Sequence, residues 1–205
     1  MKTFTALGIV FVACLCVSAQ AQQKQTVLVF NGPISSVTIT RLIAAVDERA
    51  KQGTTSLTIL INSNGGDVDA ASTAYNFLRG IPMSITTHNF GIVDSASVVL
   101  YCAGKVRLAS PDSRFVIHGI SLNFGPGASI DPNQLGELSR LVALQTDIMA
   151  RIIGLTVNKS PEVVTNALNA KTVLVAEKAK DWGLVTGIET RLYDSGADVF
   201  IVPMQ

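Results

Sequence analysis

Two kinds of apolar pattern alternate along this chain and predict an α/β fold. Short apolar runs of strand length occupy residues 26–30 and 57–61, and a further strand is expected at 84–88. Between the first two runs, residues 39–50 carry apolar side chains at the three- and four-residue spacing of an amphipathic helix. The run 57–61 lacks a polar face, which is typical of a strand covered on both sides. The alternation predicts βαβ units around a mostly parallel sheet.

The second half of the chain continues in the same way. A helix is also expected over 132–155, after a glycine-rich loop at 119–131. The other elements expected in chain order are 69–79 (helix), 95–103 (helix), strands near Val106 and Phe115, 161–168 (helix, after the capping pair Ser160-Pro161), 175–182 (helix) and 184–188 (strand). No internal repeat or low-complexity linker interrupts this order.

The first 21 residues have the composition of a cleaved signal peptide. Lys2 supplies a short positive region, residues 4–17 are apolar, and Ala19-Gln20-Ala21 is a small-x-small cleavage site. The apolar run is shorter than the roughly 20 residues that a membrane-spanning helix needs, which disfavours a retained signal anchor. We therefore expect one mature domain, residues 22–205, in the periplasm or outside the cell.

Cysteine content, charge balance and motif content exclude several classes of function. The mature chain would keep only Cys102 of three cysteines, so it could form no internal disulfide. Removal of Lys2 leaves 15 basic residues (16 minus 1) against 15 acidic ones. This balance, without a basic run, argues against nucleic acid as a partner. The chain has no P-loop pattern, so we expect no bound ATP, and we expect no metal or other cofactor.

Three segments carry candidate catalytic chemistry. Residues 57–71, LTILINSNGGDVDAA, indicate a strand, a Gly-Gly turn and the start of a helix. Residues 91–104, GIVDSASVVLYCAG, place Ser95 in a turn of small residues before an apolar helix. The run SRFVIH ends at His118, one of two histidines in the chain. Together they supply a nucleophile, a base and N–H donors for an oxyanion, at the carboxyl ends of strands.

Each of these residues also has a purely structural interpretation. Ser95 could cap the helix that follows it, and Ser97 is a competing nucleophile one turn deeper. His118 could be a satisfied core histidine, and His88 also ends a predicted strand. The Asn-Gly-Gly sequence that ends at Gly66 is common in ordinary turns. The occurrence of all three segments in this order favours the catalytic interpretation, with Ser95 preferred to Ser97.

The three segments resemble the Clp protease proteolytic subunit family of the ClpP/crotonase superfamily, whose motifs are of the types INSPGG, GQAASMGA and NSRIMIHQP. The resemblance covers residues 27–185. It implies that Ser95 is the nucleophile and that His118 is the general base. It also implies that the amides of Gly66 and Ala96 form the oxyanion hole, with Gly65 as the other member of the glycine pair.

The resemblance also implies a fold and an assembly. It predicts a ClpP/crotonase-like α/β fold with a projecting long helix at 132–155, where the residues alone allow an ordinary core helix equally well. In the family this projection pairs with another ring, so the resemblance implies a ring-like homo-oligomer.

The third catalytic position departs from the family. When Trp182-Gly183 is aligned with the family's Tyr-Gly, Lys171 falls where an aspartate should orient the histidine. A lysine cannot accept a hydrogen bond from an imidazolium. Lys171 could instead be the base of a Ser-Lys dyad, which would require burial, or a solvated surface residue. Asn169 is a neutral alternative acceptor, and Asn64 replaces the family's proline beside the glycine pair.

The first functional hypothesis is a secreted serine endopeptidase that acts without ATP on peptides or unfolded chains, with Ser95 and His118 at its centre. The alternative is a catalytically weakened or inactive relative that binds peptides or partner proteins, which the lysine at position 171 favours. A third hypothesis is the crotonase class, which acts on acyl-CoA thioesters. The short mature chain and the Ser95–His118 pair argue against it.

Overall fold

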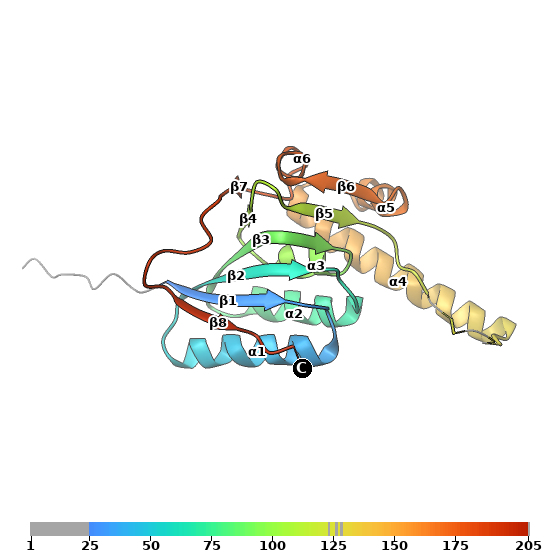
Figure 1. The fold of residues 1–205 in the computed structure, drawn as a ribbon. Helices are drawn as coiled ribbons and strands as arrows, with labels where there is room; N and C mark the ends of the chain where they lie inside the picture. The colour runs from blue at the N-terminus through green and yellow to red at the C-terminus, as the bar shows by residue number, and fades with distance from the viewer. Residues whose placement is uncertain (1–24, 123, 126, 128, 205) are drawn as a thin grey trace, which may run out of the picture.

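Alternating strands and helices make up the computed structural model, which describes residues 25–122, 124, 125, 127 and 129–204 (Figure 1). The strands are β1 (Thr26–Asn31), β2 (Ser56–Ser63), β3 (Ser84–Asp94), β4 (Val106–Ala109), β5 (Arg114–Ile117), β6 (Thr172–Val175), β7 (Gly187–Ile188) and β8 (Asp198–Ile201). The helices are α1 (Ser36–Lys51), α2 (Val68–Gly80), α3 (Ser97–Tyr101), α4 (Pro132–Val157), α5 (Pro161–Asn169) and α6 (Ala176–Asp181). The signal peptide predicted at 1–21 lies outside the described residues and stays a prediction.

One mostly parallel sheet organises these elements, which confirms the predicted fold class. The strand order is β6-β5-β3-β2-β1-β8, and β4 joins β3 to β7. Among the described strands, only the β5–β6 pair is antiparallel. Apolar side chains of the strands, such as Phe30 and Ile61, meet those of α1, α2 and α4 in one buried cluster. Burial of this apolar surface is the main favourable term in the stability of the fold.

Strand β3 is longer than predicted because it pairs with two different strands along its length. Its first part, 86–89, pairs with β4, and its last part, 92–94, pairs with β5. The pairing with β2 shifts register between the two parts. His88 therefore lies in the middle of the strand, fully buried, and the expectation that it ends a strand was wrong. Burial lowers its pKa, and the nearby Glu189 offsets part of that effect.

Helix α4 combines the two roles that the sequence left open. It begins with a capping box, in which Asp131 accepts from the Gln134 amide and the Gln134 side chain bonds back. Its N-terminal part extends away from the body of the protein (Figure 1), and Leu144 there is 58% exposed. In its C-terminal part, one face is buried from Met149 onward, whereas Leu155 on the other face stays exposed. The projecting long helix is thus confirmed, and the same helix also enters the core.

Two short strands escaped the sequence analysis. Strand β6 starts directly after Lys171 and pairs with β5, and β8 extends the sheet beyond β1. Each has only four residues, so its place depends on the neighbouring strand more than on its own pattern. Within the described residues, no single helix has the length and hydropathy of a membrane span; α4 and α5 reach them only as a pair bent by 116°.

Candidate active site

Ser95 occupies a sharp turn between β3 and α3. Its backbone has φ +58°, a left-handed conformation that non-glycine residues rarely adopt. Its amide donates to the carbonyl of Val116 in β5 at 2.8 Å, which fixes the turn against the neighbouring strand. The residue that caps α3 is Ala96, and it makes no side-chain cap bond. Ser95 is therefore not a helix cap, and its side chain is half-exposed at the carboxyl edge of the sheet.

Ser97 has a structural role instead. It is fully buried, and its Oγ lies 2.7 Å from the carbonyl oxygen of Asp94 and 3.1 Å from that of Ser63. The hydroxyl therefore donates its hydrogen to backbone at the ends of β2 and β3. These contacts hold the serine turn beside the glycine pair and leave Ser97 out of reach of a substrate.

The Gly65-Gly66 turn packs directly against Ser95. Gly65 has φ +89°, and a Cβ added to it would lie 2.6 Å from the Cβ of Ser95. Gly66 has φ +143°, and its Cβ would lie 2.2 Å from the Ile34 carbonyl oxygen. Within the described part of the chain, the amides of Gly66 and Ala96 donate to no acceptor. Two free N–H groups thus flank the serine, the arrangement that an oxyanion hole requires.

His118 follows β5, next to the strand end that carries Ser95. The pairing of Asp94 with Val116 brings the two residues to one edge of the sheet. No hydrogen bond joins their side chains in the described residues. Instead, Nδ1 of His118 lies 2.7 Å from the carbonyl oxygen of Gly119. Because a carbonyl only accepts, this contact favours the tautomer with hydrogen on Nδ1, which leaves Nε2 as the basic nitrogen.

Lys171 is brought beside His118 by the antiparallel register of β5 and β6. Ile117 pairs with Thr172, so the next residues outward, His118 and Lys171, face each other across the two strands. Lys171 has φ +50° and an exposed side chain. Its amide donates to the Leu168 carbonyl oxygen at 3.2 Å, and its side chain has no hydrogen-bond or ion-pair partner among the described residues. The exposed side chain therefore lacks the burial that a Ser-Lys dyad would require.

Comparison with known proteins identifies the family. Residues 15–191 match the sequence profile of the family described as Clp protease. The chain belongs to the Clp protease family. This membership supports a peptidase function of the serine class.

The individual relatives are distant. ATP-dependent Clp protease proteolytic subunit 1 of Chlamydia abortus is 32% identical over 137 residues, which are 64% of this chain and 69% of that protein. Subunit 2 of Mycobacterium tuberculosis is 31% identical over 134 residues, 63% of this chain and 60% of the relative. A solved structure of a ClpP1 mutant from Listeria monocytogenes superposes with a TM-score of 0.72 at 21% identity. It covers 80% of this chain and 91% of its own, and it shows the shared fold.

One charged pair in this Clp family chain escaped the sequence analysis. Asp94, directly before Ser95, accepts from Arg114 at 3.0 Å. The bond joins the end of β3 to β5, the strand that leads to His118. The other carboxylate oxygen, Oδ1, is buried and has no partner among the described groups. The signal available in the sequence was an aspartate within a turn of otherwise small or apolar residues.

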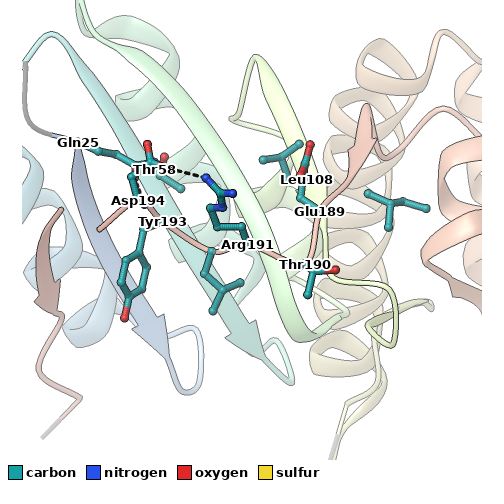
Figure 2. A pocket seen from close by; sticks show the side chains of 10 residues that line it. Gln25, Thr58, Leu108, Glu189, Thr190, Arg191, Tyr193 and Asp194 are labelled. Carbon is teal, nitrogen blue, oxygen red and sulfur yellow. Dashed lines mark hydrogen bonds and ion pairs between the residues drawn. The ribbon is translucent and has the colours of Figure 1, made fainter. Parts of the chain in front are cut away.

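Other reactive side chains lie away from this site. Cys102 is buried, and burial raises the pKa of its thiol to about 11, so the thiol stays protonated. No group of three His, Cys, Asp or Glu residues in the described ranges could hold a metal ion. A pocket of about 490 Å³ lies against the segment 188–194 and is also lined by Thr58 of β2 and Leu108 of β4 (Figure 2). Its lining includes neither Ser95 nor His118, so it is separate from the candidate active site.

Proposed function

We propose that this chain is a serine peptidase that hydrolyses peptides or unfolded chains without ATP. Ser95 is the nucleophile, His118 the general base, and the amides of Gly66 and Ala96 hold the oxyanion. The observation that carries the proposal is the contact between the Gly-Gly turn and Ser95, where a Cβ on Gly65 would come within 2.6 Å of the serine Cβ. A turn with only a structural role does not require free N–H groups beside a serine in a strained backbone conformation.

The proposed reaction has two stages. The Ser95 hydroxyl attacks the scissile carbonyl while Nε2 of His118 takes its proton, and the negative oxygen forms between the two amides. His118 then gives the proton to the leaving amine, and water releases the acyl group by the same route. Because Ser95 and His118 are not hydrogen-bonded in the single chain, the substrate or a neighbouring subunit has to bring them together.

The carbonyl of Gly119 takes the place of the acidic member of a triad. It holds Nδ1–H at 2.7 Å and so orients the ring, as a carboxylate would. A neutral carbonyl stabilises the imidazolium less than a charged carboxylate does, since hydrogen bonds between ions are roughly twice as strong as neutral ones. We therefore expect slow hydrolysis compared with an enzyme that has a complete Ser-His-Asp triad.

Labelling with a fluorophosphonate probe tests the proposal. The intact protein should gain one adduct, and peptide mapping should place it on Ser95. Hydrolysis of a fluorogenic peptide by the same sample should be slow but above background. Absence of any adduct between neutral and alkaline pH would favour the second candidate, a peptide-binding protein without catalysis. That candidate is also supported by the lack of a hydrogen bond between the side chains of Ser95 and His118 in the described residues.

Lys171 offers a sharper test of the missing acid. Lys171→Asp should raise peptide turnover by about tenfold or more, because aspartate to asparagine in a Ser-His-Asp triad costs roughly 10⁴-fold. Aspartate also tolerates the left-handed backbone found here. The control Lys171→Ala should leave turnover unchanged. Loss of activity in both variants would instead show a Ser-Lys dyad, and no change in either would mean that position 171 does not reach His118.

The proposal includes export and self-association. Exposed apolar side chains on three elements, Leu144 of α4, Val173 of β6 and Ile201 of β8, are 58%, 61% and 75% exposed and suit contacts between copies of the chain. Family membership also supports a homo-oligomer. Intact mass should show an exported chain that starts at Gln22, and light scattering at micromolar concentration should show an oligomer. A membrane-bound chain that retains Met1 would contradict export with cleavage, and a monomer in light scattering would contradict self-association.

A further inference from the structure

A second pocket, of about 430 Å³, is lined by positive charge. Arg79, Lys105 and Arg107 contribute to its wall, together with Tyr75 and Leu155. No acidic residue lines it. The mature chain is expected to be neutral overall, so three positive charges around one cavity are a local excess. We call this the cationic pocket.

The cationic pocket is separate from the candidate active site. Arg79 lies in the last turn of α2, Lys105 follows α3, and Leu155 lies in the last turn of α4. Ser95 lies at the opposite end of α3, before its first residue. A ligand in the cationic pocket would therefore not touch the serine, the histidine or the glycine pair.

The three cationic side chains differ in their hydrogen bonds within the protein. The Arg107 side chain donates to the carbonyl oxygens of Leu184 at 2.8 Å and Gly104 at 3.2 Å, which fixes it in the wall. The side chains of Arg79 and Lys105 are exposed. Neither has a hydrogen-bond or ion-pair partner in the described ranges. Two charged groups are therefore free to bind a ligand beside a third that is held in position.

The partial negative charges of nearby helix ends balance only part of the positive charge of these three side chains. The C-termini of three helices meet at the pocket, and each helix end carries about half a negative charge at most. The sum is about −1.5 against +3, and α3, with five residues, contributes less than a full helix end. A net positive charge remains after the helix ends are included. Stabilisation of the helix C-termini alone therefore does not explain three cationic side chains here.

We propose that the cationic pocket binds a small soluble molecule that carries a phosphate group. Arginine matches phosphate oxygens in a bidentate geometry, and lysine adds a compact charge. The pocket is larger than a bare phosphate needs and falls in the range of small-ligand sites. Tyr75 and the apolar side chain of Leu155, which is 74% exposed, offer contacts for an organic group attached to the phosphate.

Calorimetric titration of the full mature chain with inorganic phosphate, at constant ionic strength, tests the proposal. We expect saturable binding that weakens at least tenfold in the double variant Arg79→Gln/Lys105→Gln. A matched control, Lys51→Gln/Arg191→Gln, removes two charges from exposed ion pairs elsewhere and should bind phosphate as the parent does. Equal binding by both double variants, or no saturable binding by the parent, would overturn the proposal.

Two further measurements complete the test. Leu155→Glu places a negative charge at the pocket rim on an exposed position, so it should fold and should weaken phosphate binding even if the double variant does not fold. Vesicles that contain phosphatidic acid test a lipid headgroup as the source of the phosphate; binding to vesicles without binding of free phosphate would contradict a soluble ligand. Fluorophosphonate labelling of Ser95 should be unchanged in these variants, so the two proposals can fail separately.

Discussion

Replacing Ser95 by alanine should abolish the fluorophosphonate adduct and lower peptide turnover by at least about 10³-fold. In the proposed mechanism this hydroxyl forms the covalent intermediate, and no other side chain in the described structure occupies its place beside the glycine pair. Because Ser95 is half-exposed and makes no side-chain cap bond, the variant should keep the stability of the parent. Label incorporation, turnover and thermal unfolding of the same preparations measure these effects.

Ser97→Ala is the matched control for this prediction. It removes the same hydroxyl two residues away, but from a buried position where Oγ contacts two backbone carbonyls. We expect it to keep the adduct on Ser95 and to lose about 1–3 kcal/mol of stability, the usual cost of leaving buried polar groups unpaired. The assignment of the nucleophile would be wrong if Ser97→Ala lost the adduct while remaining folded, or if Ser95→Ala kept it.

Gly65→Ala should lower turnover by about 10²–10³-fold, the usual cost of one oxyanion donor. A Cβ at this position would lie 2.5 Å from the Asp94 carbonyl oxygen and 2.6 Å from the Ser95 Cβ. Both contacts are far below van der Waals distance, so the glycine turn has to move away from the serine. The amide of Gly66 would move with it and would no longer point at the developing negative charge.

Gly53→Ala separates this effect from backbone strain. Gly53 has φ +84°, close to the φ of Gly65, but a Cβ there would meet nothing within 4 Å. Both alanine variants should lose about 1 kcal/mol of stability from the unfavourable backbone conformation. Only Gly65→Ala should lose activity. Equal turnover in the two variants would show that the Gly65-Gly66 turn does not contribute to catalysis.

The sequence was informative where a residue type has one dominant use. Apolar runs located most strands, and the Ser160-Pro161 pair predicted the start of α5, where Ser160 caps the helix. Gly53 directly follows the C-cap of α1, and its φ of +84° is a conformation that glycine adopts readily. The motifs and the predicted order of strands both locate the glycine pair, Ser95 and His118 at the carboxyl ends of strands. The structure has them at one edge of the sheet.

The remaining features depend on contacts that leave no pattern. The carbonyl that holds His118 belongs to Gly119, and every residue has such a carbonyl, so its use cannot be read from residue types. The φ of Ser95 follows from pairing with β5, whereas the local sequence favours a helix cap. The contact of Asp94 with Arg114 joins residues 20 positions apart. Tertiary structure decides each of these features.

The division of β3 between two neighbours has a consequence for how heat inactivates this protein. The part that pairs with β4 lies between β2 and β4, whereas the last part, 92–94, lies between the end of β2 and β5. Ser95 and His118 both follow strands of this smaller unit, and β6 closes its outer edge. Such a unit can open while the rest of the sheet stays protected from hydrogen exchange. We therefore expect activity to be lost at a lower temperature than the one at which the whole chain unfolds.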